Sequence, residues 1–237
     1  MKRILIVLAA LLLGVAAVGQ EPLFPSSQLP NMRRFLPPPS DTASPAFQYD
    51  RAQYRWGLEQ RRDSARRALA TQDAEWSVDY MCRIMGGAMG VTLSKEATPA
   101  IYRMLSAGIF TADHVSETAK AYYMRVRPYM FFHEPTLAPW DEEELSRNGS
   151  YPSGHTILGW TTALLLSELA PEHADTILAR GYMYGQSRVI AGFHWQSDVD
   201  AGRLAASAAV ARLHADKHFR HLMKKARKEY KKLSRTR

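Results

Sequence analysis

The stretch Gly149-Ser-Tyr-Pro-Ser-Gly-His-Thr156 is followed by an apolar segment that runs to Leu169. Its Pro-Ser-Gly core is a turn signal, and the apolar segment is long enough for a buried helix. We therefore expect Ser153, Gly154 and His155 at a helix N-terminus, where free N–H groups and the helix dipole attract an anion. The glycine lets a ligand approach the backbone, the serine adds a hydroxyl, and the histidine exchanges protons near neutral pH. An ordinary N-capped helix with a surface histidine is the alternative that this stretch alone leaves open.

Two further segments carry residues of matching chemistry. Lys120 and Arg127 are seven residues apart, so two turns of a helix would place both on one face before a proline ends that helix. Downstream, Arg188 precedes His194, and Asp198 follows that histidine by four residues. A carboxylate at this spacing can accept a hydrogen bond from one imidazole nitrogen and leave the other as a nucleophile or base. The structural alternatives are a core salt bridge between Arg188 and Asp198, and a surface position for Lys120.

Together the segments follow the pattern Lys-x6-Arg-Pro, Pro-Ser-Gly-His and Ser-Arg-x5-His-x3-Asp. This pattern resembles the signature of the type 2 phosphatidic acid phosphatase superfamily, which includes vanadium haloperoxidases. More closely, residues 120–128, 149–156 and 185–200 are similar to the fingerprint of bacterial class A non-specific acid phosphatases. The resemblance runs from about Phe35 into the C-terminal segment.

The resemblance implies a role for each matched residue. His194 would be the nucleophile that forms a phosphohistidine, and Asp198 would hold it in the productive tautomer. His155 would protonate the leaving group and then activate water. Positive charge and hydrogen-bond donors around the phosphate oxygens would come from Lys120, Arg127, Ser153, Gly154 and Arg188. No metal or other cofactor is implied, because cationic side chains take the place of a metal.

Residues 1–19 have the features of a secretory signal peptide. Two basic residues at the start are followed by an apolar run from Ile4 to Val18, which is too short for a comfortable membrane span. Small residues at the end of the run suit cleavage before Gln20. We therefore expect export to the periplasm, and an uncleaved anchor is the alternative.

The remaining chain is expected to form one domain behind an N-terminal strap. Residues 20–48 are rich in proline and serine and predict an extended strap, because proline fixes φ and lacks a backbone donor. In residues 49–237 apolar positions recur at helical spacing, and no alternating run is long enough for a sheet. The sequence therefore predicts an all-α, single-domain helical bundle. Its expected helices are 49–71, 73–89, 94–108, 113–127, 155–169, 173–190, 197–215 and 217–233.

The positive charge of the chain is concentrated at its C-terminal end. The net charge is +8, and the segment after Asp216 carries ten Lys and Arg against Glu229 alone. Apolar residues recur there at helical spacing, which predicts an amphipathic helix that packs on the domain or on another subunit. Weak contact of its basic face with an anionic membrane is the second interpretation. We expect a homo-oligomer and no nucleic-acid partner.

The segment between Pro128 and Tyr151 joins two of the motifs, so we expect it to border the site. It contains the acidic run Asp141-Glu-Glu-Glu144. This run is either a rim that selects the leaving group or the solvated first turn of a helix.

The favoured function is a secreted, metal-independent acid phosphatase that hydrolyses small phosphate monoesters with broad specificity. A lipid-directed phosphatase or a vanadate-dependent haloperoxidase on the same site is the first alternative, and a phosphate-binding protein without turnover is the second. The closer fingerprint argues against the haloperoxidase. The His–Asp–His set argues against a pure binding protein, because binding does not require an oriented nucleophile.

Overall fold

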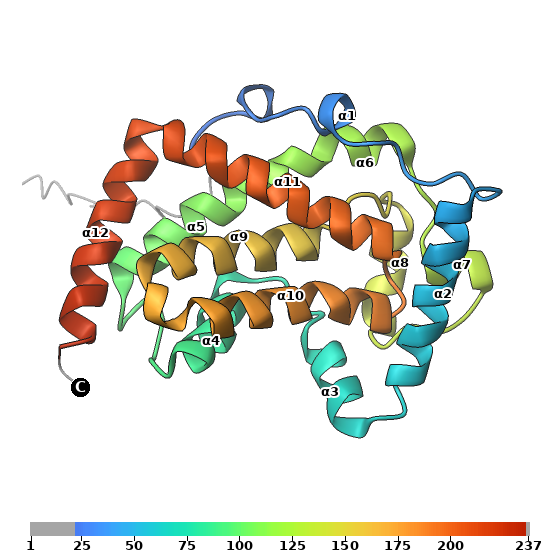
Figure 1. The fold of residues 1–237 in the computed structure, drawn as a ribbon, viewed down its shortest axis with the longest axis horizontal. Coiled ribbons are helices and arrows are strands. Elements are labelled where there is room, and N and C mark those ends of the chain that lie inside the picture. The colour runs from blue at the N-terminus through green and yellow to red at the C-terminus, as the bar shows by residue number, and fades with distance from the viewer. Residues whose placement is uncertain (1–21, 236–237) are drawn as a thin grey trace, which may run out of the picture.

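The computed structural model describes residues 22–235, and the predicted signal peptide lies outside them. Within this range the chain forms helices and turns and no strand, which confirms the predicted all-α class. In Figure 1, α9 (Gly154–Leu169), α10 (Ala174–Ile190) and α11 (Gln196–Ala215) lie side by side. Helix α5 (Pro99–Asp113) lies beside them, and α12 (Lys217–Leu233) crosses one end of the bundle.

Helix α9 is the centre of the bundle, because α10, α11 and α5 all pack against it. A helix surrounded in this way is apolar on every side, and residues such as Ile157 and Leu165 are fully buried. Gly159 and Gly181 allow α9 and α10 to approach closely: a Cβ atom at Gly159 would lie 2.4 Å from the Tyr184 ring. None of the helices within residues 22–235 combines the length and the apolar composition that a membrane crossing requires.

The three motif segments meet at one end of the bundle. The N-terminal end of α9, the C-terminal end of α10 and the N-terminal end of α11 lie together there (Figure 1). Three further helices lie at the same end: α2 (Pro45–Gln60), α7 (Pro128–Phe132) and α8 (Glu142–Ser146). Helix packing therefore brings together residues that lie far apart in the sequence.

Several helix boundaries that were predicted in the N-terminal half of the chain are wrong. The single helix expected over 49–71 is two helices, α2 and α3 (Ser64–Gln72), because the Asp63 carboxylate caps α3 by accepting hydrogen bonds from two backbone N–H groups. Likewise α4 (Val78–Met89) begins after the Ser77 cap and not at residue 73. Helix α5 begins at Pro99 instead of residue 94, with the proline in the first turn, where its missing N–H costs nothing.

The helix predicted over 113–127 is also wrong. Its first residues form the 3-10 turn η2 (His114–Ser116), and α6 (Glu117–Tyr123) ends where Met124 adopts a left-handed φ of 40°. The next residues are extended, as expected before a proline, and Pro128 starts α7 instead of ending a helix. Lys120 and Arg127 therefore do not share one helical face, and that prediction is wrong.

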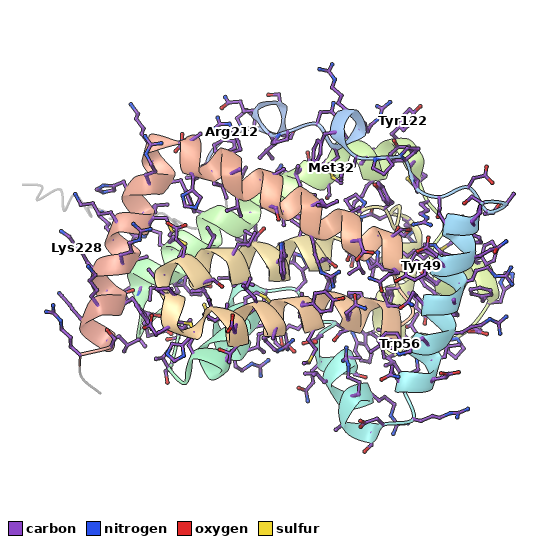
Figure 2. All side chains as sticks on the ribbon, viewed as in Figure 1. Met32, Tyr49, Trp56, Tyr122, Arg212 and Lys228 are labelled. Carbon is purple, nitrogen blue, oxygen red and sulfur yellow. The ribbon has the colours of Figure 1, made fainter. Side chains whose placement is uncertain are left out.

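The N-terminal strap is less uniform than the sequence suggests. It contains the short turns η1 (Ser26–Gln28) and α1 (Met32–Phe35), and α2 begins at Pro45, inside the range expected to be extended. Figure 1 shows the strap passing over α11 and α6, and Figure 2 shows Met32 beneath α1 and Arg212 on α11 beside the strap. Met32 is buried, and Arg212 Nε donates to the carbonyl of Gln28 at 3.1 Å. The strap is therefore packed on the bundle.

The C-terminal helix α12 packs its apolar face on the body of the domain, mainly against α5. The buried residues of this face are Phe219, Leu222, Met223, Ala226 and Tyr230. Figure 2 shows Lys228 pointing away from the bundle, on the opposite side of the helix. The packing agrees with the favoured interpretation of this segment, while the expected oligomer and the membrane contact stay predictions.

Candidate active site

A cavity of about 1090 Å³ opens at the end of the bundle where α9 begins. Five of the eight predicted site residues line it: Lys120, Arg127, Gly154, His155 and His194. The other three, Ser153, Arg188 and Asp198, are fully buried. The structure thus brings residues of all three motifs to one place, and the roles expected for them stay predictions.

The predicted helix N-terminus is confirmed at α9. Ser153 is the N-cap: its Oγ accepts a hydrogen bond from the backbone N–H of Thr156 at 3.3 Å, and its own N–H donates to the Asp198 carbonyl at 3.0 Å. The first N–H groups of a helix have no partner within it, so those of Gly154 and His155 are available to an anion. The second contact joins the start of α9 to the start of α11.

Lys120 and Arg127 reach the cavity from α6 and from the extended segment after it. The segment is held by Trp195, whose indole N–H donates to the Val126 carbonyl at 2.8 Å. Lys120 Nζ donates to the Gly149 carbonyl at 2.9 Å, and Arg127 Nη1 donates to the Phe193 carbonyl at 3.2 Å. Burial, and then the neighbouring Arg127, lower the Lys120 pKa to about 7, and burial lowers the Arg127 pKa to about 10. An anion between them would favour the charged form of both.

Arg188 is fully buried, and within residues 22–235 none of its three guanidinium nitrogens has a hydrogen-bond partner. Its guanidinium lies over the Phe193 ring, 4.4 Å from the centroid, and burial lowers its pKa to about 10. The alternative of a core salt bridge to Asp198 is wrong. An unpaired buried cation costs free energy, which a bidentate anion would offset. We refer to Lys120, Arg127 and Arg188 as the cationic cluster.

His194 is held between the cationic cluster and a carboxylate. Its Nε2 lies 3.2 Å from Arg127 Nη1, and its Nδ1 lies 3.4 Å from Asp198 Oδ2. Because arginine can only donate, Nε2 accepts, and the ring proton is on Nδ1, facing Asp198. The Nδ1 contact lacks hydrogen-bond geometry, a looseness common in unliganded sites. Burial, and then the three members of the cationic cluster, hold the His194 pKa well below its usual value, so the imidazole is neutral and Nε2 keeps its lone pair.

His155 is fixed by contacts on two sides. Its Nε2 donates to the Ala74 carbonyl at 2.9 Å, which leaves Nδ1 for other chemistry. Its ring stacks on Tyr184 with the centroids 5.9 Å apart. Burial, and then Arg188, hold the His155 pKa well below its usual value. A phosphate bound to the cationic cluster would offset that cationic charge and raise the pKa again.

Two residues that were not predicted from the sequence hold Asp198 in place. Arg125 Nη1 donates to Asp198 Oδ1 at 2.5 Å, and Arg125 Nη2 donates to Asp50 Oδ2 at 2.7 Å. Asp50 also accepts from the backbone N–H of Ser197 at 2.8 Å, and the N–H of Trp195 donates to Asp198 Oδ2 at 2.8 Å. The side chains of Arg125, Asp50 and Asp198 are buried, so the carboxylate facing His194 has little freedom to rotate. Arg125 could have been found by its place inside the first motif, whereas no spacing points to Asp50.

The loop between α7 and α9 borders the cavity, as predicted. Trp140, Asp141 and Glu144 line it. Asp141 is the N-cap of α8, and the three glutamates of the acidic run form its first turn. The carboxylate of Glu142 turns the other way and accepts hydrogen bonds from the backbone N–H and hydroxyl of Thr136, at 3.0 and 2.6 Å. Some residues of the run therefore face the cavity and others stabilise the loop, and selection of the leaving group stays a prediction.

Comparison with known proteins places these residues in a family context. The model of the PAP2 superfamily matches residues 97–221, which include all eight predicted site residues. The non-specific acid phosphatase of Providencia stuartii is 43% identical over 209 residues, which cover 88% of this chain and 84% of that protein. The non-specific acid phosphatase of Salmonella typhimurium is 40% identical over 211 residues, or 88% and 84%. The acid phosphatase of Zymomonas mobilis is 39% identical over 198 residues, or 84% and 75%.

Proposed function

The chain belongs to the PAP2 superfamily and is an acid phosphatase, and we propose that it hydrolyses small phosphate monoesters of broad specificity through a phosphohistidine at His194, without a metal. The observation that carries the proposal is the position of a neutral His194, whose Nε2 faces the cationic cluster. That cluster includes the buried Arg188, which has no hydrogen-bond partner within residues 22–235. We further propose that residues 1–19 direct export to the periplasm.

Substrate binding would follow from the charges of the site. A phosphate monoester dianion needs positive charge around its three equatorial oxygens. Arg188, whose nitrogens have no partner within residues 22–235, can donate two parallel hydrogen bonds. Arg127 can donate from Nη2, because its Nε and Nη1 already bind backbone carbonyls, and Lys120 acts as a point charge. The free N–H groups at the start of α9 add donors that are already oriented. This arrangement leaves the apical position opposite the leaving group to His194 Nε2.

In the first chemical step, Nε2 of His194 attacks phosphorus, the Nε2–P bond forms and the bond to the leaving oxygen breaks. The Nδ1 proton stays on the imidazole, and the negative charge of Asp198 stabilises the ring as it becomes cationic. His155, protonated at Nδ1 in the complex, donates that proton to the leaving oxygen. The cationic cluster stabilises the charge on the equatorial oxygens throughout.

In the second step, water takes the place of the leaving group. The now neutral His155 accepts a proton from this water, whose oxygen attacks phosphorus. The Nε2–P bond breaks, and inorganic phosphate leaves with His194 again neutral and His155 again protonated. One histidine thus acts first as an acid and then as a base, which requires its pKa to lie near the working pH when phosphate is bound.

The direct test is hydrolysis of p-nitrophenyl phosphate between pH 4 and 9 by the purified chain. We expect turnover that is greatest on the acid side, and inhibition by vanadate, which mimics pentacoordinate phosphorus. Absence of turnover with p-nitrophenyl phosphate and with a panel of sugar and nucleoside monophosphates would contradict the proposal.

We expect Asp198→Asn to lower kcat by about 10⁴-fold, by analogy with the same change in a serine-protease triad. An amide in this position can donate to Nδ1, which would favour the wrong tautomer of His194, and it also leaves Arg125 with one carboxylate fewer. Steady-state kinetics measure the effect. Asp200→Asn is the matched control, because this exposed residue of α11 pairs with Arg203, and its kcat should stay within about threefold of wild type.

Removal of metal ions is expected to leave activity unchanged. Within residues 22–235, no three His, Cys, Asp or Glu side chains are grouped so that they could hold a metal ion. The measurement is the rate of p-nitrophenyl phosphate hydrolysis after dialysis against EDTA. A loss of most activity that zinc or magnesium restores would show that a metal takes part.

A further inference from the structure

Asp113 is a carboxyl at the site to which the mechanism above gives no role. It is the last residue of α5, and it lines the cavity. Its Oδ1 lies 3.4 Å from the position that a Cβ atom at Gly154 would occupy. The backbone at Asp113 is held, because its carbonyl accepts a hydrogen bond from Ser116 Oγ at 2.9 Å. In contrast, the described part of the chain offers its carboxyl neither a hydrogen bond nor an ion pair.

The charged groups around Asp113 come from three elements. Lys120 and Glu117 face it from α6, His114 from η2, and His155 is next to Gly154 on α9. Burial raises the pKa of Asp113, while Lys120 and then His114 act in the opposite direction. The net effect is a raised pKa of Asp113, although the ammonium group of Lys120 is near. Asp113 therefore takes up a proton at a higher pH than an exposed aspartate does.

An anion at the start of α9 must lie against this carboxyl. Gly154 has no side chain to separate Asp113 from the helix N-terminus, where the free N–H groups would hold phosphate. Carboxylate and phosphate oxygens are both acceptors, and their negative charges repel each other. They can be in contact only if one proton lies between them.

We propose that Asp113 is a further phosphate-binding residue, which acts as a protonated carboxylic acid and donates its O–H to an oxygen of the bound phosphate. Each binding event near neutral pH then takes up one proton at Asp113. Above the Asp113 pKa the carboxyl must take up a proton before it can donate, so binding weakens as the pH rises and the chain prefers acid conditions. The inference rests on the proposed function only in that the same cavity holds phosphate.

If Asp113 instead stayed ionised in the complex, it would assist binding through Lys120, and its substitution would have the opposite effect on anion affinity. An ionised Asp113 would favour the charged form of Lys120 and so assist binding. Under that role, Asp113→Asn would weaken anion binding at every pH. Under our proposal, the amide that this substitution introduces donates a hydrogen bond at every pH, so the variant binds more tightly than wild type where the wild-type carboxyl is ionised.

The test is calorimetric binding of sulfate to wild type and to Asp113→Asn between pH 5 and 7. Sulfate stays a dianion over this range, and Lys120, whose pKa is about 7, keeps most of its proton at pH 5 to 6 and about half of it at pH 7. Above the Asp113 pKa, we expect the affinity of wild type for sulfate to fall with rising pH more steeply than that of the variant, by a further factor of about ten per pH unit. Titrations in buffers of different ionisation enthalpy should show about one proton fewer taken up by the variant at pH 7.

Glu117→Gln is the matched control, because Glu117 also lines the cavity but is exposed and pairs with His114. The Glu117→Gln substitution should leave the change of sulfate affinity with pH as it is in wild type. Weaker sulfate binding by Asp113→Asn at all pH values, or an equal slope and equal proton uptake, would overturn the proposal. If the variant does not fold, wild type alone still tests the proposal, since sulfate binding by wild type without proton uptake at pH 7 would overturn it. Sulfate binding needs no turnover, so these results are independent of whether the chain hydrolyses p-nitrophenyl phosphate.

Discussion

Replacing His194 by alanine is expected to lower kcat for p-nitrophenyl phosphate by about 10⁴-fold or more, because the variant has no atom that can attack phosphorus. The cationic cluster and the start of α9 stay in place, so the variant should still bind phosphate and vanadate. The two effects together distinguish a lost nucleophile from a lost binding site. A solvent-exposed histidine offers the comparison: His218→Ala on α12 should leave kcat unchanged within about twofold.

The measurement is kcat and the inhibition constant for phosphate, with circular dichroism as the check of folding. A His194→Ala variant with kcat within tenfold of wild type would mean that water attacks the ester directly. In that case the role of His194 would be electrostatic, and the two-step mechanism would be wrong.

Arg188→Met is expected to raise stability and to lower kcat/KM by about 10²- to 10³-fold. The wild-type residue is a fully buried cation whose nitrogens have no hydrogen-bond partner within residues 22–235. A side chain of similar volume without charge removes that cost, and we expect a gain of about 1–4 kcal/mol in the free energy of unfolding. The loss of activity follows because two hydrogen bonds to the phosphoryl oxygens disappear.

Arg180→Met on the same helix is the matched control for stability. Arg180 Nη2 donates to Asp73 Oδ1 at 2.5 Å, and Asp73 is fully buried. Removing the cation leaves this carboxylate without its charge partner, so we expect a loss of about 3–5 kcal/mol in the free energy of unfolding.

Thermal unfolding with and without phosphate completes the test of Arg188. Phosphate at 100 times its dissociation constant should stabilise wild type by about 2.7 kcal/mol and Arg188→Met by much less. A destabilised Arg188→Met would show that Arg188 is a structural residue.

The sequence predicted the part of the site that is local in the chain. The turn before α9 and the apolar run after it determined where the helix starts, because capping and burial depend on neighbouring residues. The pairing of His194 with Asp198 was likewise predictable, since both lie near the start of α11. The class of fold followed from helical periodicity along most of the chain.

The remainder depends on contacts between distant segments. Lys120 and Arg127 do meet at the cavity, but the path between them is a helix end, a left-handed Met124 and an extended stretch held by Trp195. A spacing of seven residues is compatible with this path and also with two turns of a helix. The spacing alone therefore could not distinguish the two conformations. Asp50 reaches Asp198 only through Arg125, across tertiary contacts that no sequence spacing records.

Asp113 illustrates the same limit. The predicted boundary made it the first residue of a helix, whereas it ends α5 and lies against the start of α9. Its proposed role depends on its closeness to Gly154, which has no side chain to separate Asp113 from the start of α9. That closeness arises only when the two helices pack together.

The central claim is that the phosphoryl group is transferred to Nε2 of His194. The most direct test mixes wild type with a labelled monoester, quenches the reaction within milliseconds in alkali, and locates the label by mass spectrometry. We predict one phosphoryl group per chain, on His194, stable in base and lost in acid. Rapid turnover with no phosphorylated protein, or with the label on another residue, would contradict the account.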